Sequence, residues 1–366
     1  MAAIDAGALL ATMSTNSPML SLDRPGNIVE LQAQIEQSRT ALLGAIGNPA
    51  DITVLRSWGN WGDTLISAGL RALLRDLSYR EYDIRLVDSA PSGDLAIITG
   101  GGSWCKAFHA MPSFLPLAEA RFRRVIVFPS TYDLEEPSVR EALSQTRAIV
   151  FARERRSYEQ IGALCDSRLG HDTAFFFDFS PYQSGAASGI LHAFREDAET
   201  IGASVPDDNR DISQDCSSLD DWLWTISRHA LVRTDRAHVM IAAAMLGKPI
   251  EYRPSSYHKV SALIDYCIPK GLISPLAAGN DWTRAPGIEP PGSEIVRDVP
   301  NPADVDALDA ECKRLAYELQ EMRNELGALR SSWSWRFTLP LRAVASATIA
   351  IKAALGSCLH PNRKND

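Results

Sequence analysis

Two short segments, far apart in the chain, carry side chains that could hold an anion and move a proton. The first is Gly59-Asn60-Trp61-Gly62-Asp63, and the second is Thr234-Asp235-Arg236-Ala237-His238. Each follows an apolar run typical of a strand and precedes a pattern typical of a helix. In α/β proteins, anions bind at such helix N-termini, beside the carboxyl ends of parallel strands. The two segments therefore predict a cleft between two α/β halves.

The first segment has the residue types of an anion site. Gly59 and Gly62 let the backbone turn tightly and approach a ligand, while Asn60 and Asp63 bring polar side chains to the helix entrance. Free N–H groups at this end attract phosphate or carboxylate. We expect Asp63 to be the N-cap of the helix. A capped turn without a ligand explains the same residues equally well.

A glycine run in the same half adds a second candidate for the binding edge. Gly100, Gly101 and Gly102 follow the predicted strand 95–99. Successive glycines permit positive φ and expose neighbouring N–H groups, which together form a nest for an anion. Taken alone, the run is better explained as a flexible turn. Two glycine-rich strand ends in one half favour a ligand-binding edge.

The second segment supplies a proton-transfer group and a permanent charge. His238 can exchange a proton near neutral pH, and Arg236 stays cationic beside it. Three further cations follow predicted strands at the same edge: Arg153, Arg195 and Lys259. Each could bind a carboxylate or phosphate. Each could equally be a solvated surface charge.

Alternating apolar runs and helical patterns place these groups on an α/β scaffold. The predicted strands are 52–55, 84–87, 95–99, 125–128, 148–151 and 174–177, and then 189–195, 230–232 and 250–252. The patterns between them predict helices, including 31–46, 66–77, 219–228 and one that Thr234 or Asp235 caps and Gly247 ends. Strands separated by helices predict a mostly parallel sheet covered on both faces.

Composition changes along the chain predict its domain organisation. We expect an N-terminal arm with a short helix over residues 1–48, a first half over 49–184 and a second half over 185–282. A Pro- and Gly-rich linker covers 283–302. Residues 303–330 repeat apolar side chains at heptad spacing, which predicts a coiled coil that either forms a homodimer or packs on the body of the same chain.

The last segment, 331–366, is an amphipathic tail with two open interpretations. Trp333, Trp335 and Arg336 precede an Ala- and Ile-rich helical pattern interrupted by Lys352. Aromatic side chains beside arginines suit a peripheral membrane contact, which we assign to residues 331–357. The same residues suit a helix docked on the core of the protein.

The bulk composition excludes several functional classes. The 366 residues are 45% hydrophobic and carry a net charge of −8, which argues against a nucleic-acid binder. The six cysteines form no C-x-x-C pair, so neither a disulfide scaffold nor a metal site is expected. No apolar run is long enough to span a bilayer, and the N-terminus lacks the basic region of a signal peptide. We therefore expect a cytoplasmic protein.

These segments, in this order, resemble the polysaccharide pyruvyl transferase family over about residues 50–268. The pieces that carry the resemblance are residues 59–66, the triple glycine, 128–130, 152–157, His171-Asp172, 234–238, and 247–249 followed by Lys259. Two positions depart from the family pattern, Ala237 in place of Leu and Val239 in place of Gly. Both departures leave Arg236 and His238 in place.

The resemblance implies two Rossmann-like halves, as in GT-B glycosyltransferases, with phosphoenolpyruvate as donor and no metal or redox cofactor. Pyruvate would be joined as a ketal to two hydroxyls of one sugar, and phosphate would be released. Arg153, Arg236, Arg195 and Lys259 would hold the donor, together with the glycine-rich segments. His238 and Asp63 would serve as general acid and base, in an order that stays open.

The tail adds an expectation about the acceptor. The run Ser331-Ser332-Trp333-Ser334-Trp335-Arg336 is similar to the ends of bacterial cell-surface glycosyltransferases. That similarity implies a lipid-linked sugar at the inner face of the membrane. Two other functions stay open from the sequence: a GT-B-like glycosyltransferase that uses a nucleotide sugar, and a non-catalytic scaffold that oligomerises through its heptads.

Overall fold

The computed structural model describes residues 23–276, apart from residues 109, 184, 198, 199, 201–203 and 256. The predicted linker, coiled coil and amphipathic tail lie outside the described residues. Their proposed contacts with a membrane or a second copy therefore stay predictions.

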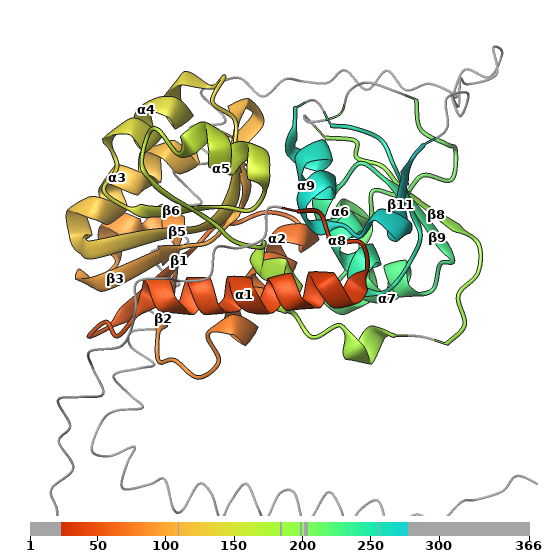
Figure 1. Cartoon of the computed structure of the whole chain (residues 1–366), viewed down its shortest axis with the longest axis horizontal. Helices are drawn as coiled ribbons and strands as arrows, with labels where there is room; N and C mark the ends of the chain where they lie inside the picture. Colours follow the sequence, from red (N-terminus) through yellow and green to blue (C-terminus); the bar gives the residue numbers. More distant parts are fainter. Residues whose placement is uncertain are drawn as a thin grey trace, which may run out of the picture. The chain divides into compact units, whose positions relative to one another are not determined.

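The described elements alternate between helix and strand along most of the chain (Figure 1). The strands are β1 (Ile52–Arg56), β2 (Arg80–Asp83), β3 (Gly93–Ile98), β4 (Gly101–Trp104), β5 (Phe122–Tyr132), β6 (Ile149–Ala152), β7 (Asp166–Leu169), β8 (Ile190–Ala193), β9 (Leu231–Thr234), β10 (Ile250–Tyr252) and β11 (Ile273–Pro275). The α-helices are α1 (Ile28–Ile46), α2 (Trp61–Leu73), α3 (Met111–Arg121), α4 (Pro137–Gln145), α5 (Arg155–Ile161), α6 (Ile212–Asp215), α7 (Leu219–Ser227), α8 (Ala237–Met245) and α9 (Lys259–Cys267). Short 3₁₀ helices are η1 (Ile84–Ser89), η2 (Lys106–Phe108), η3 (Thr173–Phe176), η4 (Ser180–Tyr182) and η5 (Lys270–Leu272).

The first series of strands forms a parallel sheet with the order β2-β1-β3-β5-β6-β7, in which β4 also pairs with β5. Its central strands are apolar on both faces, and Val54, Ile97 and Val127 are fully buried. Helices cover the sheet, so these side chains lose their contact with water, which is the main stabilising contribution to such a core. The predicted strands at 52–55, 95–99, 125–128 and 148–151 are confirmed.

The second series forms a smaller parallel sheet with the order β11-β10-β9-β8. The predicted strands at 189–195, 230–232 and 250–252 are confirmed as β8, β9 and β10. The α/β class with parallel sheets is therefore confirmed. The comparison with GT-B enzymes stays a prediction.

Two predicted strands are wrong. Residues 84–87 lie in η1, and the strand of that region is β2, just before it. Residues 174–177 lie largely in η3, and the strand is β7, at Asp166–Leu169. Both β2 and β7 are at the edges of the sheet and carry charged residues, as edge strands commonly do, so their sequences lack the apolar signal. The apolar 3₁₀ residues pack on the core instead.

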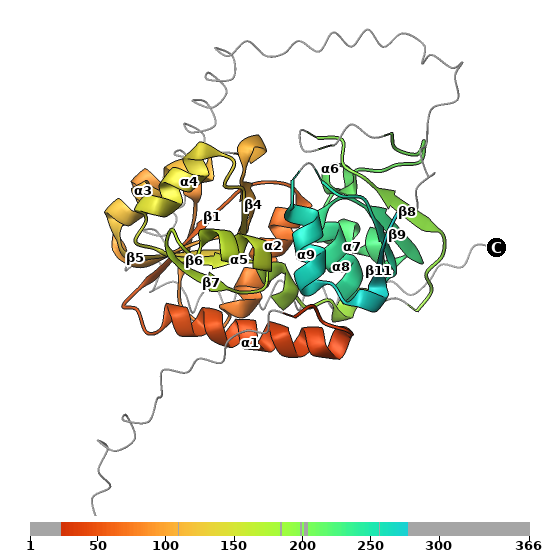
Figure 2. The ribbon, with the colours of Figure 1, turned by 45° about the horizontal axis from the view of Figure 1, so that its top comes forward.

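Helices α1 and α2 connect the two sheets. α2 follows β1 and also packs on α6, α7 and α8 of the second series. α1 runs beside both sheets in two views (Figures 1 and 2). Just before α1, the Arg24 guanidinium donates to the Ile268 carbonyl at 2.8 Å, and at its end Arg124 donates to the Ile46 carbonyl at 3.2 Å. These contacts fix the second sheet beside the first.

The closest backbone approach between these elements occurs at Gly69 of α2. A Cβ at this position would lie 1.9 Å from the Thr173 carbonyl oxygen of η3. That distance is far inside van der Waals contact, so only glycine allows α2 to pack at this depth.

We expect Gly69→Ala to destabilise the fold by about 1–3 kcal/mol, because the overpacked backbone must shift. Gly44→Ala is the matched control, since no heavy atom lies within 4 Å of its added Cβ in α1. The control should raise stability by about 0.5–1 kcal/mol. Chemical denaturation of both variants measures the difference, and equal stabilities would contradict the packing described here.

Candidate active site

A cavity of about 560 Å³ opens where helices of both series meet. Its lining contains most of the residues that the sequence singles out. The lining residues are Trp58, Gly59, Asn60, Trp61, Asp63, Thr64, Gly102, Ser103, Arg153, Arg195, Asp197, Ser213, Gln214, Arg236, Ala237, His238 and Lys259. A pocket of this size and mixed polarity is typical of small-molecule sites.

The start of α2 forms one side of the cavity. Asn60, not Asp63, is the N-cap: its side-chain oxygen accepts from the Gly62 amide at 2.9 Å. Asp63 completes a capping box by accepting from the Asn60 amide at 3.0 Å. The predicted cap was therefore three residues too late, because Asp63 faces back toward the helix entrance from the third helical position.

Asp63 also faces the cationic groups of the cavity. Burial raises the pKa of its carboxyl group, and the charges of His238, Lys259 and Arg153 offset that rise only in part. A carboxyl group with a raised pKa can exchange a proton closer to neutral pH than an ordinary aspartate can.

Arg153, Asp172 and His238 form a buried polar cluster at the base of the cavity. Arg153 follows β6, and its Nη1 donates to Asp172 Oδ2 at 2.7 Å. The same carboxylate oxygen lies 3.3 Å from His238 Nε2, at the start of α8. One carboxylate therefore orients both the guanidinium and the imidazole.

The charges around Asp172 keep it ionised. Burial alone would raise its pKa, but the hydrogen bond and charge of His238 and the charge of Arg153 outweigh burial. The pKa of this carboxyl group therefore lies well below its usual range.

Arg153 keeps one nitrogen for a further partner. Its side chain is buried, its Nε donates to Thr131 Oγ1 at 2.8 Å, and its Nη2 has no hydrogen-bond partner within the described part of the chain. A buried guanidinium nitrogen without a partner is costly. Because Arg153 lines the cavity, a bound anion would supply the missing acceptor.

Two glycines let side chains from different elements meet at this point. A Cβ at Gly62 would lie 2.4 Å from His238 Nδ1, so α2 admits the imidazole only without a side chain there. A Cβ at Gly102 would lie 3.2 Å from Arg153 Nη2 and 3.1 Å from Lys259 Cδ. Both glycines therefore let neighbouring side chains come close to the backbone, where a larger residue would collide with them.

Lys259 begins α9 and is buried beside the cavity. Burial, followed by the charges of Arg195 and Arg153, holds the pKa of its ammonium group well below the usual range. Its nitrogen lies 5.3 Å from the centre of the Tyr257 ring. An anion placed near Lys259 and Arg153 would relieve the repulsion between these cations.

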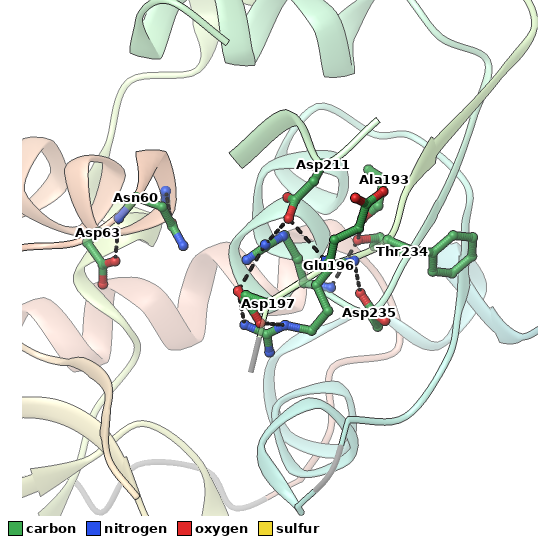
Figure 3. A network of polar contacts seen from close by, with 12 residues as sticks. Asn60, Asp63, Ala193, Glu196, Asp197, Asp211, Thr234 and Asp235 are labelled. Atoms are coloured by element: carbon green, nitrogen blue, oxygen red, sulfur yellow. Dashed lines mark hydrogen bonds and ion pairs between the residues drawn. The ribbon is translucent and has the colours of Figure 1, made fainter. Parts of the chain in front are cut away.

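Arg195 and Arg236 also line the cavity, and carboxylates already contact both of them. Figure 3 shows two of these carboxylates, Asp197 and Asp211, apart from Asn60 and Asp63. Arg195 Nε donates to Asp197 Oδ1 at 2.8 Å, and Arg236 Nη2 donates to Asp197 Oδ2 at 3.0 Å. Arg236 Nη2 also contacts Asp211. Burial would lower the pKa of Arg236, but Asp211 and Asp197 raise it.

Three residues of the predicted site have other positions or roles. Asp235 does not cap α8: it accepts from the Arg195 amide at 2.8 Å and from Arg253 at 3.1 Å, and α8 starts after Arg236 without a side-chain cap. Gly100 and Gly101 are not among the residues that line the cavity. Gly100 packs on the Pro129 backbone, and Gly101 has a φ of 134°.

Asp172 and Asp197 are the main residues absent from the predicted site, although His171-Asp172 was among the segments that carry the family resemblance. Asp172 follows β7, and the wrong strand at 174–177 hid this strand end. Its neighbour His171 is fully buried, and its ring lies 5.0 Å from that of Tyr266. Burial lowers the pKa of His171 to about 3, so it is a neutral core residue. Asp197 stands in a polar stretch without a recognisable motif.

Comparison with known proteins decides the family. The family model for polysaccharide pyruvyl transferases matches residues 60–250, which is more than half of the chain. The chain belongs to the polysaccharide pyruvyl transferase family. The match includes Asn60, Asp63, Arg153, Asp172 and His238 and ends before Lys259.

A solved structure supports the fold of this pyruvyl transferase family member. The protein KP1_0663 of Klebsiella pneumoniae subsp. pneumoniae NTUH-K2044, described as functionally uncharacterised, is 22% identical. Its TM-score is 0.54, and the similarity covers 67% of this chain and 99% of that chain. No curated protein matches. At this identity the similarity shows the fold alone.

Two further properties of the transferase, taken from its described residues, concern membranes and metal ions. None of the helices in this part of the chain is both long and apolar enough to cross a membrane. Within residues 23–276, as far as they are described, no group of three or more His, Cys, Asp or Glu side chains is arranged to hold a metal ion.

We expect Asp172→Asn to lower the free energy of unfolding by about 3–5 kcal/mol at neutral pH, because it breaks a buried ion pair. The folded-state pKa of Asp172 is depressed. Its stabilising contribution is therefore complete above the unfolded value of about 4 and is lost as the pH falls below it.

Denaturation of the wild-type and Asp172→Asn proteins from neutral to acidic pH measures this contribution. The stability difference should narrow below about pH 4, where the unfolded-state carboxyl group becomes protonated. Asp178→Asn is the control, since Asp178 contacts only Ser180 near the surface in the described part of the chain. A difference that stays constant with pH would contradict an ionised Asp172.

Proposed function

We propose that this protein transfers the pyruvyl group of phosphoenolpyruvate to two hydroxyl groups of one sugar in a polysaccharide or its lipid-linked precursor. The product is a cyclic ketal, and phosphate is released. Membership of the polysaccharide pyruvyl transferase family gives the general reaction. The observation that supports the donor is made at Arg153, which lines the cavity and whose buried Nη2 has no hydrogen-bond partner among the described residues.

The donor carries two anionic groups, a phosphate and a carboxylate, and the cavity offers matching donors. Arg153 Nη2 supplies one charged hydrogen bond, and Lys259 supplies a second positive charge beside it. The first turn of α2 adds the positive end of the helix dipole. Together these groups can hold both ends of a small acid phosphate.

The reaction moves two protons from the sugar hydroxyls to the donor, one to its methylene carbon and one to its phosphate. A proton adds to the methylene carbon of the enol, and a first sugar hydroxyl bonds to the neighbouring carbon. The bond from that carbon to the phosphate oxygen then breaks, and the second hydroxyl bonds to the same carbon. One hydroxyl proton ends on the new methyl group and the other on the released phosphate, so the reaction balances without a redox partner.

His238 and Asp63 are the groups that we propose for proton transfer. His238 Nε2 lies 3.3 Å from Asp172 Oδ2, which orients the imidazole ring in the cavity. Asp63 lines the same cavity, and burial raises the pKa of its carboxyl group. Two titratable groups in different environments can deliver and accept the protons at the same pH.

The donor is tested by thermal shift and by product analysis. Phosphoenolpyruvate should raise the melting temperature, because it binds the native state, whereas UDP-glucose should not. Arg153→Lys should bind phosphoenolpyruvate about 10- to 100-fold more weakly, since a hydrogen bond to a charged group is worth about 1.5–3 kcal/mol. Arg156→Lys, on an exposed position of α5, is the matched control.

Two outcomes would contradict this donor assignment. One is stabilisation by UDP-glucose with release of nucleotide instead of phosphate. The other is equal affinity of the Arg153→Lys and Arg156→Lys proteins for phosphoenolpyruvate.

His238→Gln tests the proton-transfer role separately from binding. The variant should lower kcat by about 100- to 10,000-fold, the usual contribution of general acid–base catalysis. Its thermal shift with phosphoenolpyruvate should stay close to that of the wild type. Phosphate release in single-turnover conditions measures the chemical step. Wild-type turnover by this variant would place the proton transfer elsewhere and would fit a non-catalytic role for the residue.

A further inference from the structure

The cavity has room for more than one small ligand. Its volume is about 560 Å³, in the range of sites for ligands several times larger than a three-carbon acid phosphate. The donors proposed for that compound are Arg153, Lys259 and the start of α2, and Figure 3 shows Asn60 and Asp63 of that start lying apart from Asp197. Arg195, Asp197 and Arg236 also line the cavity, and we call these three residues the Asp197 wall.

The Asp197 wall is a preformed network of balanced charge. Asp197 accepts from Arg195 at 2.8 and 3.1 Å and from Arg236 at 3.0 Å. Asp211 contacts Arg236 from the other side. Burial would raise the pKa of Asp197, but its contacts with Arg195 and Arg236 lower it, so the carboxylate stays ionised. Its side chain keeps 19% of its surface exposed where it lines the cavity.

This network is suited to a neutral polyhydroxyl ligand better than to an anion. An ionised carboxylate between two guanidinium groups cancels their attraction for phosphate and repels a second anion at short range. A sugar hydroxyl both donates and accepts hydrogen bonds, and the wall offers a carboxylate acceptor beside guanidinium donors. Ser213 and Gln214 line the same cavity and add further polar groups of both kinds.

An aromatic ring at the cavity rim supplies the apolar surface that a sugar ring also needs. Trp58 lines the cavity and is 41% exposed. The Arg85 guanidinium lies 4.7 Å from the centre of its ring, and the Phe114 ring packs edge-on at 6.1 Å. These contacts hold the indole in place, so it forms a rigid platform with an accessible apolar surface.

We propose that the Asp197 wall binds the acceptor, and that the sugar residue which receives the pyruvyl group is uncharged. Asp197 would hold the sugar hydroxyls opposite the donor, as a binding and positioning residue. Figure 3 shows the arrangement: Asn60 and Asp63 lie on one side, with Asp197 and Asp211 on the other. The inference rests on the proposed function for the identity of its ligand, although its test uses sugar binding alone.

Saturation-transfer NMR with methyl glycosides of glucose, galactose, mannose and N-acetylglucosamine tests this wall in the full-length protein. At least one glycoside should receive saturation from the wild type, also when phosphoenolpyruvate is present in excess. Asp197→Asn removes the charge at constant shape and should reduce the transfer at least fivefold. Asp197→Glu, which moves the carboxylate, serves as a second variant. Asp215→Asn is the control, on an exposed aspartate of α6 outside the cavity lining.

The thermal shift with phosphoenolpyruvate, measured on the same variants, reports whether the site remains folded. Loss of glycoside transfer with retained donor stabilisation supports the assignment. Undiminished transfer in both Asp197 variants, displacement of the glycoside by phosphoenolpyruvate, or no transfer from the wild type to any of the glycosides would overturn it. A wild type that binds glycosides but is not stabilised by phosphoenolpyruvate would count against the proposed donor and leave the acceptor wall in place.

Discussion

One carboxylate oxygen, Oδ2 of Asp172, organises the site. It accepts from Arg153 at 2.7 Å and lies 3.3 Å from His238 Nε2, so residues of the two halves share a single buried charge. Separating any of these groups would leave an uncompensated charge away from water, which is strongly unfavourable. The contact of Asp172 with Arg153 and His238 therefore helps to determine the relative position of β6, β7 and α8, together with the apolar core. It also fixes Arg153 so that its Nη2 lines the cavity.

The packing around this contact leaves little freedom. Gly62 admits the His238 ring against α2, and Gly102 lies against both Arg153 and Lys259. A side chain at either glycine would displace a cationic or titratable group by direct contact. Arg24, just before α1, contacts the Ile268 carbonyl near the second sheet, and the Ile46 carbonyl at the end of α1 accepts from Arg124 of the first sheet, so this segment links the two sheets. Cations that would repel one another in isolation are thus held close together, which is the condition for binding a small multivalent anion.

The sequence predicts those parts of the fold that depend on buried apolar strands. The central strands β1, β3, β5 and β6 have continuous apolar runs, and their positions follow from that pattern. The edge strands β2 and β7 are charged and have no such signal, so residues 84–87 and 174–177 were misassigned. That error concealed Asp172. The sequence near the start of α2 also could not show whether Asn60 or Asp63 is the N-cap. Nor could it show that the Asp235 carboxylate accepts from Arg253, because this contact joins residues that are distant in sequence.

Most of the residues that the sequence selected for chemistry do meet at the cavity, although their partners divide them into two groups. Among the described residues, Arg153 Nη2 and Arg236 Nε both lack an acceptor, but Arg195 and Arg236 already share the Asp197 carboxylate, whereas the carboxylate beside Arg153, Asp172, is shared with His238. The account therefore places the donor anion beside Arg153. A crystal structure of the protein with bound phosphoenolpyruvate tests this placement most directly. It should show a phosphate or carboxylate oxygen within hydrogen-bond distance of Arg153 Nη2, with the Asp197 contacts intact. A ligand that displaces Asp197 from Arg195 and Arg236 and leaves Arg153 Nη2 without an acceptor would contradict it.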